Sequence, residues 1–204
     1  MFDYPDRQKY FEAISKQLEP NIVKHSLALE ACMGGLYDYF HPEGDRPLVD
    51  AINDPPKNDW LLAGLIHDID FGGEFKPTHP LKTKEALALY NLDISESVHN
   101  IIKAHAPSLT GKNPTNKADW SIFCADSLTG LIIATTLVYP SKKMSDVKLS
   151  SILKRFRKEP KFAAGTRRDE VIQCEKPEGL NLSLDKFTEI CFNSMKVIAT
   201  EIGL

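Results

Sequence analysis

The sequence predicts an all-α protein, and three observations support this fold class. Apolar residues recur at helical spacing in the long segments, and no segment shows the alternation of apolar and polar residues that is typical of strands. The chain has 204 residues, 42% of them hydrophobic and 26% charged, as in ordinary globular proteins. We therefore expect one helical-bundle domain over 1–204, with its core at about 20–140 and with 141–204 packed on that core.

The first two helices are predicted from the spacing of apolar residues. Residues 7–18 should form the first helix, and the second should run from about 21 to 40 with Ile22 and Leu29 on one face. Residues 41–58 contain four prolines, so we expect a loop there with at most a short turn of helix.

The next two helices are predicted from the residues at their ends. Asn58 or Asp59 should cap a short, very apolar helix over 60–67, because both side chains are favoured at this position. Two consecutive glycines shortly afterwards should end this segment. Another helix is expected to follow Pro80 and to end near Tyr90.

Three further helices complete the predicted bundle. The run at 93–96 resembles a capping box and should start a helix that extends to about His105. Residues 117–139 are apolar on nearly all sides and therefore predict a central helix. Ser183 should cap a final amphipathic helix that lies on the core.

The distribution of charge predicts an anion site. The formal net charge is only −3, which does not favour nucleic acid or membrane as a partner. However, residues 142–168 carry ten Lys or Arg against two acids, so one basic segment stands in an acidic protein. Within this segment we expect Lys143 and Arg167 to bind substrate phosphate, since Arg suits bidentate phosphate binding.

The cysteines and the N-terminus predict an intracellular environment. The four cysteines are far apart and form no C-x-x-C pair, so we expect reduced core residues. The N-terminal residues are polar, and no apolar run approaches the ~20 residues that a membrane-spanning helix needs. The expected location is the cytoplasm, and the sequence does not predict an oligomeric state.

Several polar residues occupy positions where an apolar residue belongs. His25 and His105 lie on the apolar faces of their predicted helices. His67 and Asp68 come at the end of the apolar run WLLAGLI. Asp126 lies within an apolar helix. A buried, unpaired carboxylate costs several kcal/mol, so both aspartates need cations. Imidazole and carboxylate together suit one or two ions of Mn, Fe, Co, Ni or Zn, with Mg as an alternative. The pattern therefore predicts a metal centre.

These residues stand in an order that resembles a known signature. The segments KHSLALEACM, LLAGLIHDID and FCADSLTG match, in order, the His, His-Asp and Asp motifs of the HD-domain superfamily of metal-dependent phosphohydrolases. From about residue 20 onward the chain is similar to a bacterial and archaeal branch of predicted HD hydrolases, including YPSKKMSDVKLSSILKRF and FAAGTRR. The resemblance implies that one ion is bound by His25, His67, Asp68 and Asp126.

Family members with two ions add two histidines between the doublet and the last aspartate. His79 and His105 resemble these positions, and the resemblance implies that they bind a second ion, which Asp68 bridges to the first. His99 lies ~100° around its helix from the apolar face, so we interpret it as a flanking residue. His41, in the proline-rich loop, is expected to be solvated.

The resemblance implies hydrolysis of a small phosphorylated molecule, such as a nucleotide. Metal binding brings the pKa of water from 15.7 toward 7, which supplies a nucleophile at neutral pH. Asp68 would take part as the bridging ligand, and Asp70 or Glu74, just past the doublet, would protonate the leaving group. The sequence does not specify the substrate.

Two other functions fit the same residues. A mixed-valent di-iron oxygenase of the same fold would use the same six ligands to cleave C–C or C–P bonds with O2. A non-catalytic, nucleotide-binding regulator would occur on a degenerate scaffold, and it predicts missing ligands. Iron content combined with an O2-consumption assay would separate the oxygenase from the hydrolase.

Overall fold

A computed structural model describes residues 2–44 and 53–204. The described residues form helices joined by turns and loops, with no strand among them, which confirms the all-α prediction. The α-helices are α1 (Arg7–Gln17), α2 (Pro20–Phe40), α3 (Lys57–Ile66), α4 (Thr83–Ala88), α5 (Glu96–Ala104), α6 (Pro107–Thr110), α7 (Lys117–Leu137), α8 (Leu149–Lys158), α9 (Arg168–Val171), α10 (Leu184–Val197) and α11 (Ala199–Ile202). The 3-10 helices are η1 (Ile69–Phe71), η2 (Gly73–Thr78), η3 (Met144–Asp146) and η4 (Ile172–Glu175).

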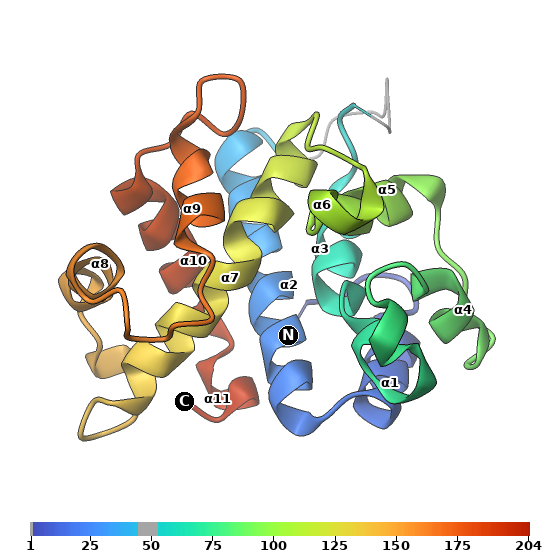
Figure 1. Cartoon of the computed structure of the whole chain (residues 1–204), viewed down its shortest axis with the longest axis horizontal. Helices are drawn as coiled ribbons and strands as arrows, with labels where there is room; N and C mark the ends of the chain where they lie inside the picture. Colours follow the sequence, from blue (N-terminus) through green and yellow to red (C-terminus); the bar gives the residue numbers. More distant parts are fainter. Residues whose placement is uncertain (1, 45–52) are drawn as a thin grey trace.

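Helices α2 and α7 lie side by side in the middle of the molecule. Helices α1, α3, α4 and α5 lie on one side of this pair, and α8, α9 and α10 lie on the other (Figure 1). Helix α2 contacts α3, α7 and α10, and α7 contacts α5 and α9. The two long helices therefore connect both halves of the bundle.

One hydrophobic core extends through both halves, from Tyr10 to Ile202. The central helix α7 contributes buried residues along most of its length, as its sequence predicts. By length and composition alone, α7 is apolar enough to cross a membrane, so the expectation that no run was long enough was too strict. However, 67% of that apolar window is buried within the molecule, as in the core helix of a soluble protein. All four cysteines are free and buried, as expected.

The helix ends differ from the predictions at several places. Helix α3 begins at Lys57 after Pro56, so neither Asn58 nor Asp59 caps it. Helix α5 is capped by Ser95, whose side chain accepts a hydrogen bond from the backbone N–H of Val98. Both proline and small polar residues are favoured at the start of a helix, so the sequence offers several candidates near each start. In α3 and α5 the candidate next to the first turn precedes the helix.

Two predicted segments also need correction. The final helix is interrupted at Ile198, which separates α10 from α11, although Ser183 does cap α10 as predicted. The proline-rich loop is shorter than predicted because α3 starts early. Residues 45–52 of this loop, including Pro47, lie outside the described residues.

Candidate metal centre

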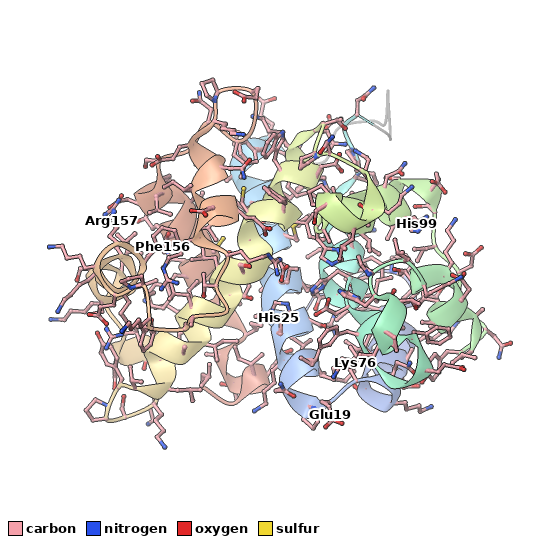
Figure 2. All side chains as sticks on the ribbon, viewed as in Figure 1. Glu19, His25, Lys76, His99, Phe156 and Arg157 are labelled. Atoms are coloured by element: carbon pink, nitrogen blue, oxygen red, sulfur yellow. The ribbon has the colours of Figure 1, made fainter. Side chains whose placement is uncertain are left out.

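Four helices and one connecting segment bring the predicted ligands together. His25 projects from α2 and Asp126 from α7, while His67 directly follows α3 and His105 directly follows α5. His79 directly follows η2. Figure 2 shows His25 near the middle of the molecule, between the two halves of the bundle.

A close approach of α3 to α2 positions His67 against His25. A Cβ atom at Gly64 would lie 2.9 Å from the backbone N and Cα atoms of Glu30 in α2. Only glycine allows the two backbones to approach this closely without a shift. Because His67 follows Gly64 by three residues, this contact fixes the end of α3 beside α2.

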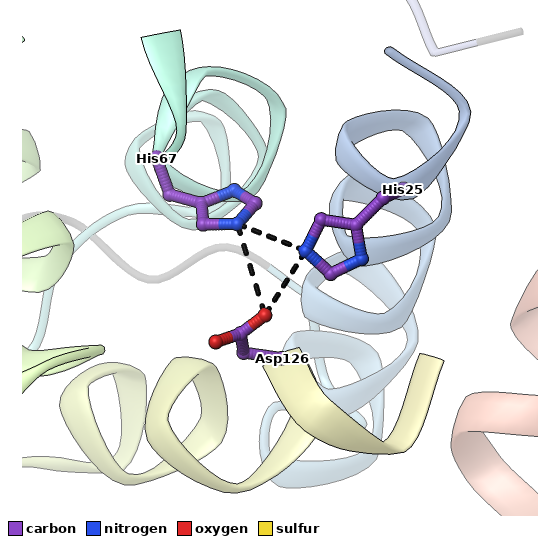
Figure 3. Close-up of side chains that lie close together, drawn as sticks. All are labelled: His25, His67 and Asp126. Carbon is purple, nitrogen blue, oxygen red and sulfur yellow. Dashed lines mark hydrogen bonds and ion pairs between the residues drawn. The ribbon is translucent and has the colours of Figure 1, made fainter. Parts of the chain in front are cut away.

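The first ligand group consists of His25, His67 and Asp126, which come from three helices (Figure 3). The Nε2 atom of His25 lies 3.1 Å from Nε2 of His67 and 3.0 Å from Oδ1 of Asp126. The third side of the triangle, between Nε2 of His67 and Oδ1 of Asp126, measures 3.8 Å. Three donor atoms that converge in this way could hold a metal ion.

The second ligand group consists of Asp68, His79 and His105. Asp68 lies between the groups. Its Oδ2 atom is 3.3 Å from Nε2 of His67, and its Oδ1 atom is 3.4 Å from Nε2 of His79. The two carboxylate oxygens thus face different groups, as a carboxylate that bridges two ions does.

Hydrogen bonds at Nδ1 fix the orientation of the four imidazoles. Nδ1 of His67 lies 2.9 Å from the carbonyl of Gly64, and Nδ1 of His105 lies 2.5 Å from the carbonyl of Ile102. Nδ1 of His79 lies 2.7 Å from Oδ1 of Asp70. These oxygens can only accept, so each Nδ1 carries a proton, and Nε2 is the nitrogen left to bind a metal ion.

The fourth imidazole, that of His25, is oriented by the hydroxyl of Thr129. The Thr129 hydroxyl donates to the backbone carbonyl of Asp126 at 2.7 Å, so it can accept from Nδ1 of His25, which is 2.9 Å away. All four histidines therefore direct Nε2 toward the two carboxylates. A metal ion could be held between these atoms.

The Nε2 atom of His105 indicates that these residues fit a metal ion. His105 is 3% exposed, and its Nε2 atom has no hydrogen-bond partner. A buried polar atom without a partner costs about 1–3 kcal/mol, so such atoms are rare unless a ligand or ion satisfies them. The orphaned Nε2 lies in the second ligand group, where an ion would satisfy it.

The charges of the centre shift the pKa values of its members. Although burial alone would lower it, the pKa of His67 is raised to about 9 by the carboxylates of Asp68 and Asp126. Burial opposes ionisation of both carboxylates, but the neighbouring histidines hold their pKa values below the usual range. Burial, together with the charge of His67, lowers the pKa of His105 to about 4.

The centre opens into a cavity of about 600 Å³. Arg167 lines this cavity, and its Nη2 atom donates to Oδ2 of Asp126 at 2.6 Å. Its Nε atom donates to Glu170, which also lines the cavity. The structure thus brings the predicted Arg167 to the ligand groups.

Lys143 does not lie at this cavity. It is exposed and precedes η3, at the far end of the turn that follows α7. Of the ten basic residues in the segment, Arg167 alone lines the cavity. Arg168 donates instead to the carbonyls of Phe156, Glu159 and Phe162. Arg168 therefore has a structural role.

Neither of the two predicted proton donors lines the cavity. Asp70 is 0% exposed, and both of its oxygens accept hydrogen bonds, one from His79 and one from the backbone N–H of Lys82. Asp70 is thus placed to position His79. Glu74 is exposed in η2 and is not among the residues that line the cavity.

The remaining histidines lie outside the two groups. His99 lies at the outer edge of the molecule, 3.9 Å from Glu96, as a flanking residue (Figure 2). His41 is not solvated as predicted. Its ring stacks on Tyr37 with centroids 4.0 Å apart, and Nδ1 bonds to the Tyr37 carbonyl.

Sequence reasoning missed Thr129, which holds a ligand, and named Asp70 only as a proton donor and not as the partner of His79. A sequence signal was available for each of them. Thr129 follows Asp126 by three residues and so shares its helix face, and Asp70 is a further acid two residues after the doublet.

Comparisons with family models, curated proteins and solved structures gave no match to this chain. A functional assignment therefore depends on the chemistry of the site itself. That site combines imidazole and carboxylate donors, which could hold a metal ion, with a guanidinium at an open cavity.

Proposed function

We propose that the chain is a metal-dependent phosphohydrolase of the HD-domain type that cleaves a phosphoester of a small molecule, nucleotides included. The observation that supports this most is the meeting of two ligand groups, built from four histidines and two aspartates, at one cavity. The donor set suits one or two ions of Mn, Fe, Co, Ni or Zn better than Mg or Ca.

The chain's residues would hold the ions and orient the substrate. Divalent ions at such a centre lower the pKa of water toward 7 and neutralise charge on phosphoryl oxygens. His25, His67 and Asp126 would hold one ion, and His79 and His105 the other, with Asp68 between them. The guanidinium of Arg167, in the same cavity, can donate to phosphate oxygens in a bidentate manner.

The test is metal analysis of protein purified without added ions, followed by a panel of phosphomonoesters and phosphodiesters. His67→Ala and Asp68→Ala should abolish metal retention and turnover, while circular dichroism reports nearly unchanged helix content. His99→Ala is the matched control, because His99 lies outside both ligand groups. Unchanged metal stoichiometry in the His67 or Asp68 variant would refute the ligand assignment.

The same protein preparation separates the two enzymatic alternatives. Hydrolysis of a phosphoester in the absence of O2, with Zn as a redox-silent ion, supports the hydrolase. Iron in the purified protein, O2 consumption and no hydrolysis of any phosphoester would instead identify an oxygenase with the same ligands.

A further inference from the structure

We infer that the substrate is a phosphomonoester with an uncharged, apolar organic part, and that the cavity discriminates against a second charged group. This inference deepens the proposed phosphohydrolase function and rests on it. Three features of the cavity carry it: its charge, its walls and the space beside α7.

The positive charge at the cavity is enough for one phosphate group and no more. Two divalent ions would bring four positive charges, of which Asp68 and Asp126 neutralise two. Arg167 and Glu170 form an ion pair and neutralise each other, and no other Lys or Arg lines the cavity among the described residues. The buried carboxylate of Asp70, bonded to His79, removes one more positive charge, so the positive charge left does not exceed what one phosphomonoester, with about −1.5 to −2 at pH 7, would neutralise. A second anionic group would find no cation to receive it.

Part of the wall away from the ligands is apolar, while Ser108, Ser127 and Thr166 line other parts of it. Leu109 lines the cavity with 61% of its surface exposed, so a bound apolar group could cover it and remove that area from water. Ile22 and Phe71 also line the cavity. Leu109 is held in place, because the Thr110 hydroxyl donates to the carbonyls of Lys103 and Ala106 and so ties α6 to the end of α5.

The cavity also has free space beside α7. Gly130 lines it, and a Cβ atom built at Gly130 would meet nothing within 4 Å. Gly130 lies four residues after Asp126, on the same face of α7. An organic group attached to a phosphate near Asp126 therefore has room to extend along α7.

Calorimetric titration with non-hydrolysable phosphonates tests this inference without relying on turnover. The Mn-loaded protein is titrated with inorganic phosphate, with methyl-, butyl- and hexylphosphonate, and with a butylphosphonate that ends in a carboxylate. We expect the affinity to rise about two- to fourfold per added methylene over the first few carbons. The carboxylated compound should bind at least tenfold more weakly than butylphosphonate.

Single substitutions test which side chains cause the dependence of affinity on chain length. Leu109→Ser should flatten the dependence on chain length and leave the affinity for phosphate unchanged. Leu89→Ser is its control, because Leu89 is similarly exposed, at 57%, but does not line the cavity. Gly130→Leu should prevent binding of hexylphosphonate while phosphate still binds.

The possible failures are distinguishable. Phosphate binding with equal affinity for all chain lengths, or tighter binding of the carboxylated compound, would overturn this inference and leave the proposed function standing. A protein that retains neither Mn nor phosphate would overturn both.

Discussion

At the residue scale, the orientation of His25 depends on one hydroxyl group. The Thr129 hydroxyl accepts from Nδ1 of His25 and donates to the Asp126 carbonyl, so it links two predicted ligands. Thr129→Val keeps the shape of the side chain and removes both hydrogen bonds. We expect metal affinity to fall about 10–100-fold, as for other partners that orient ligating histidines.

A chelator competition titration measures this loss. Thr135→Val is the control, because Thr135 is equally buried in α7 but its hydroxyl has no hydrogen-bond partner. Equal affinities of the two variants would show that the Thr129 hydroxyl does not orient His25.

His67 makes the stability of metal-free protein depend on pH. Its pKa is about 9 in the folded protein, against 6.5 for an unperturbed histidine. The folded state therefore binds more protons than the unfolded state between these values. This contribution to stability is complete below pH 6.5 and is lost as the pH rises toward 9.

Urea unfolding of chelator-treated protein tests this trend. The free energy of unfolding should fall by on the order of 3 kcal/mol between pH 6 and pH 9.5. His67→Gln should remove most of the change. A wild-type stability that stays flat or rises over this range would contradict the assigned pKa shift.

At the scale of elements, Gly64 controls the distance between α2 and α3. In Gly64→Ala the new Cβ would press on the backbone of Glu30, which cannot rotate away as a side chain can. We expect a loss of stability of about 1–3 kcal/mol, measured by urea unfolding. Metal affinity should also fall, because His67 would move away from His25.

Gly130→Ala is the matched control for this variant. It also lies within a helix, but its new Cβ would meet nothing within 4 Å. Alanine is the better helix former, so this variant should gain up to about 1 kcal/mol. If both alanine variants gained stability, the close approach at Gly64 would not limit the packing of α2 and α3.

The long helices could be predicted from the sequence, and the shortest ones could not. Helices α2, α7 and α10 present apolar faces to the core, and periodicity records such faces directly. The four-residue helices α6 and α9 are too short for a period, and their positions depend on tertiary contacts. Helix ends were less predictable because several capping residues compete near each end.

At the scale of the whole molecule, the six predicted ligands lie close together. They could be predicted from the sequence because several of them are polar residues at positions that are otherwise apolar. A polar side chain on an apolar helix face is destabilising unless it has a partner in the core. His25 and Asp126 could therefore be identified as candidate ligands. Lys143 and Arg167 had no such mark. Both lie in loops, whose paths follow from distant contacts rather than from local patterns.

The last prediction concerns how an ion would join the two halves of the bundle. The ligands of the first group come from α2, from α7 and from the end of α3, so an ion binds them only while these elements are packed. Binding to the folded state alone, at 100 times Kd, adds about 2.7 kcal/mol. For a chain of this size, that raises Tm by about 5–10 °C.

Differential scanning calorimetry with and without a chelator measures this shift. The His67→Ala variant should unfold at the same temperature in both conditions, because it lacks a ligand from the first group. The His99→Ala variant should keep the full shift of the wild type, since His99 lies outside both groups. If the wild type also showed no shift at saturating Mn or Zn, these side chains would not form a metal centre that links the helices.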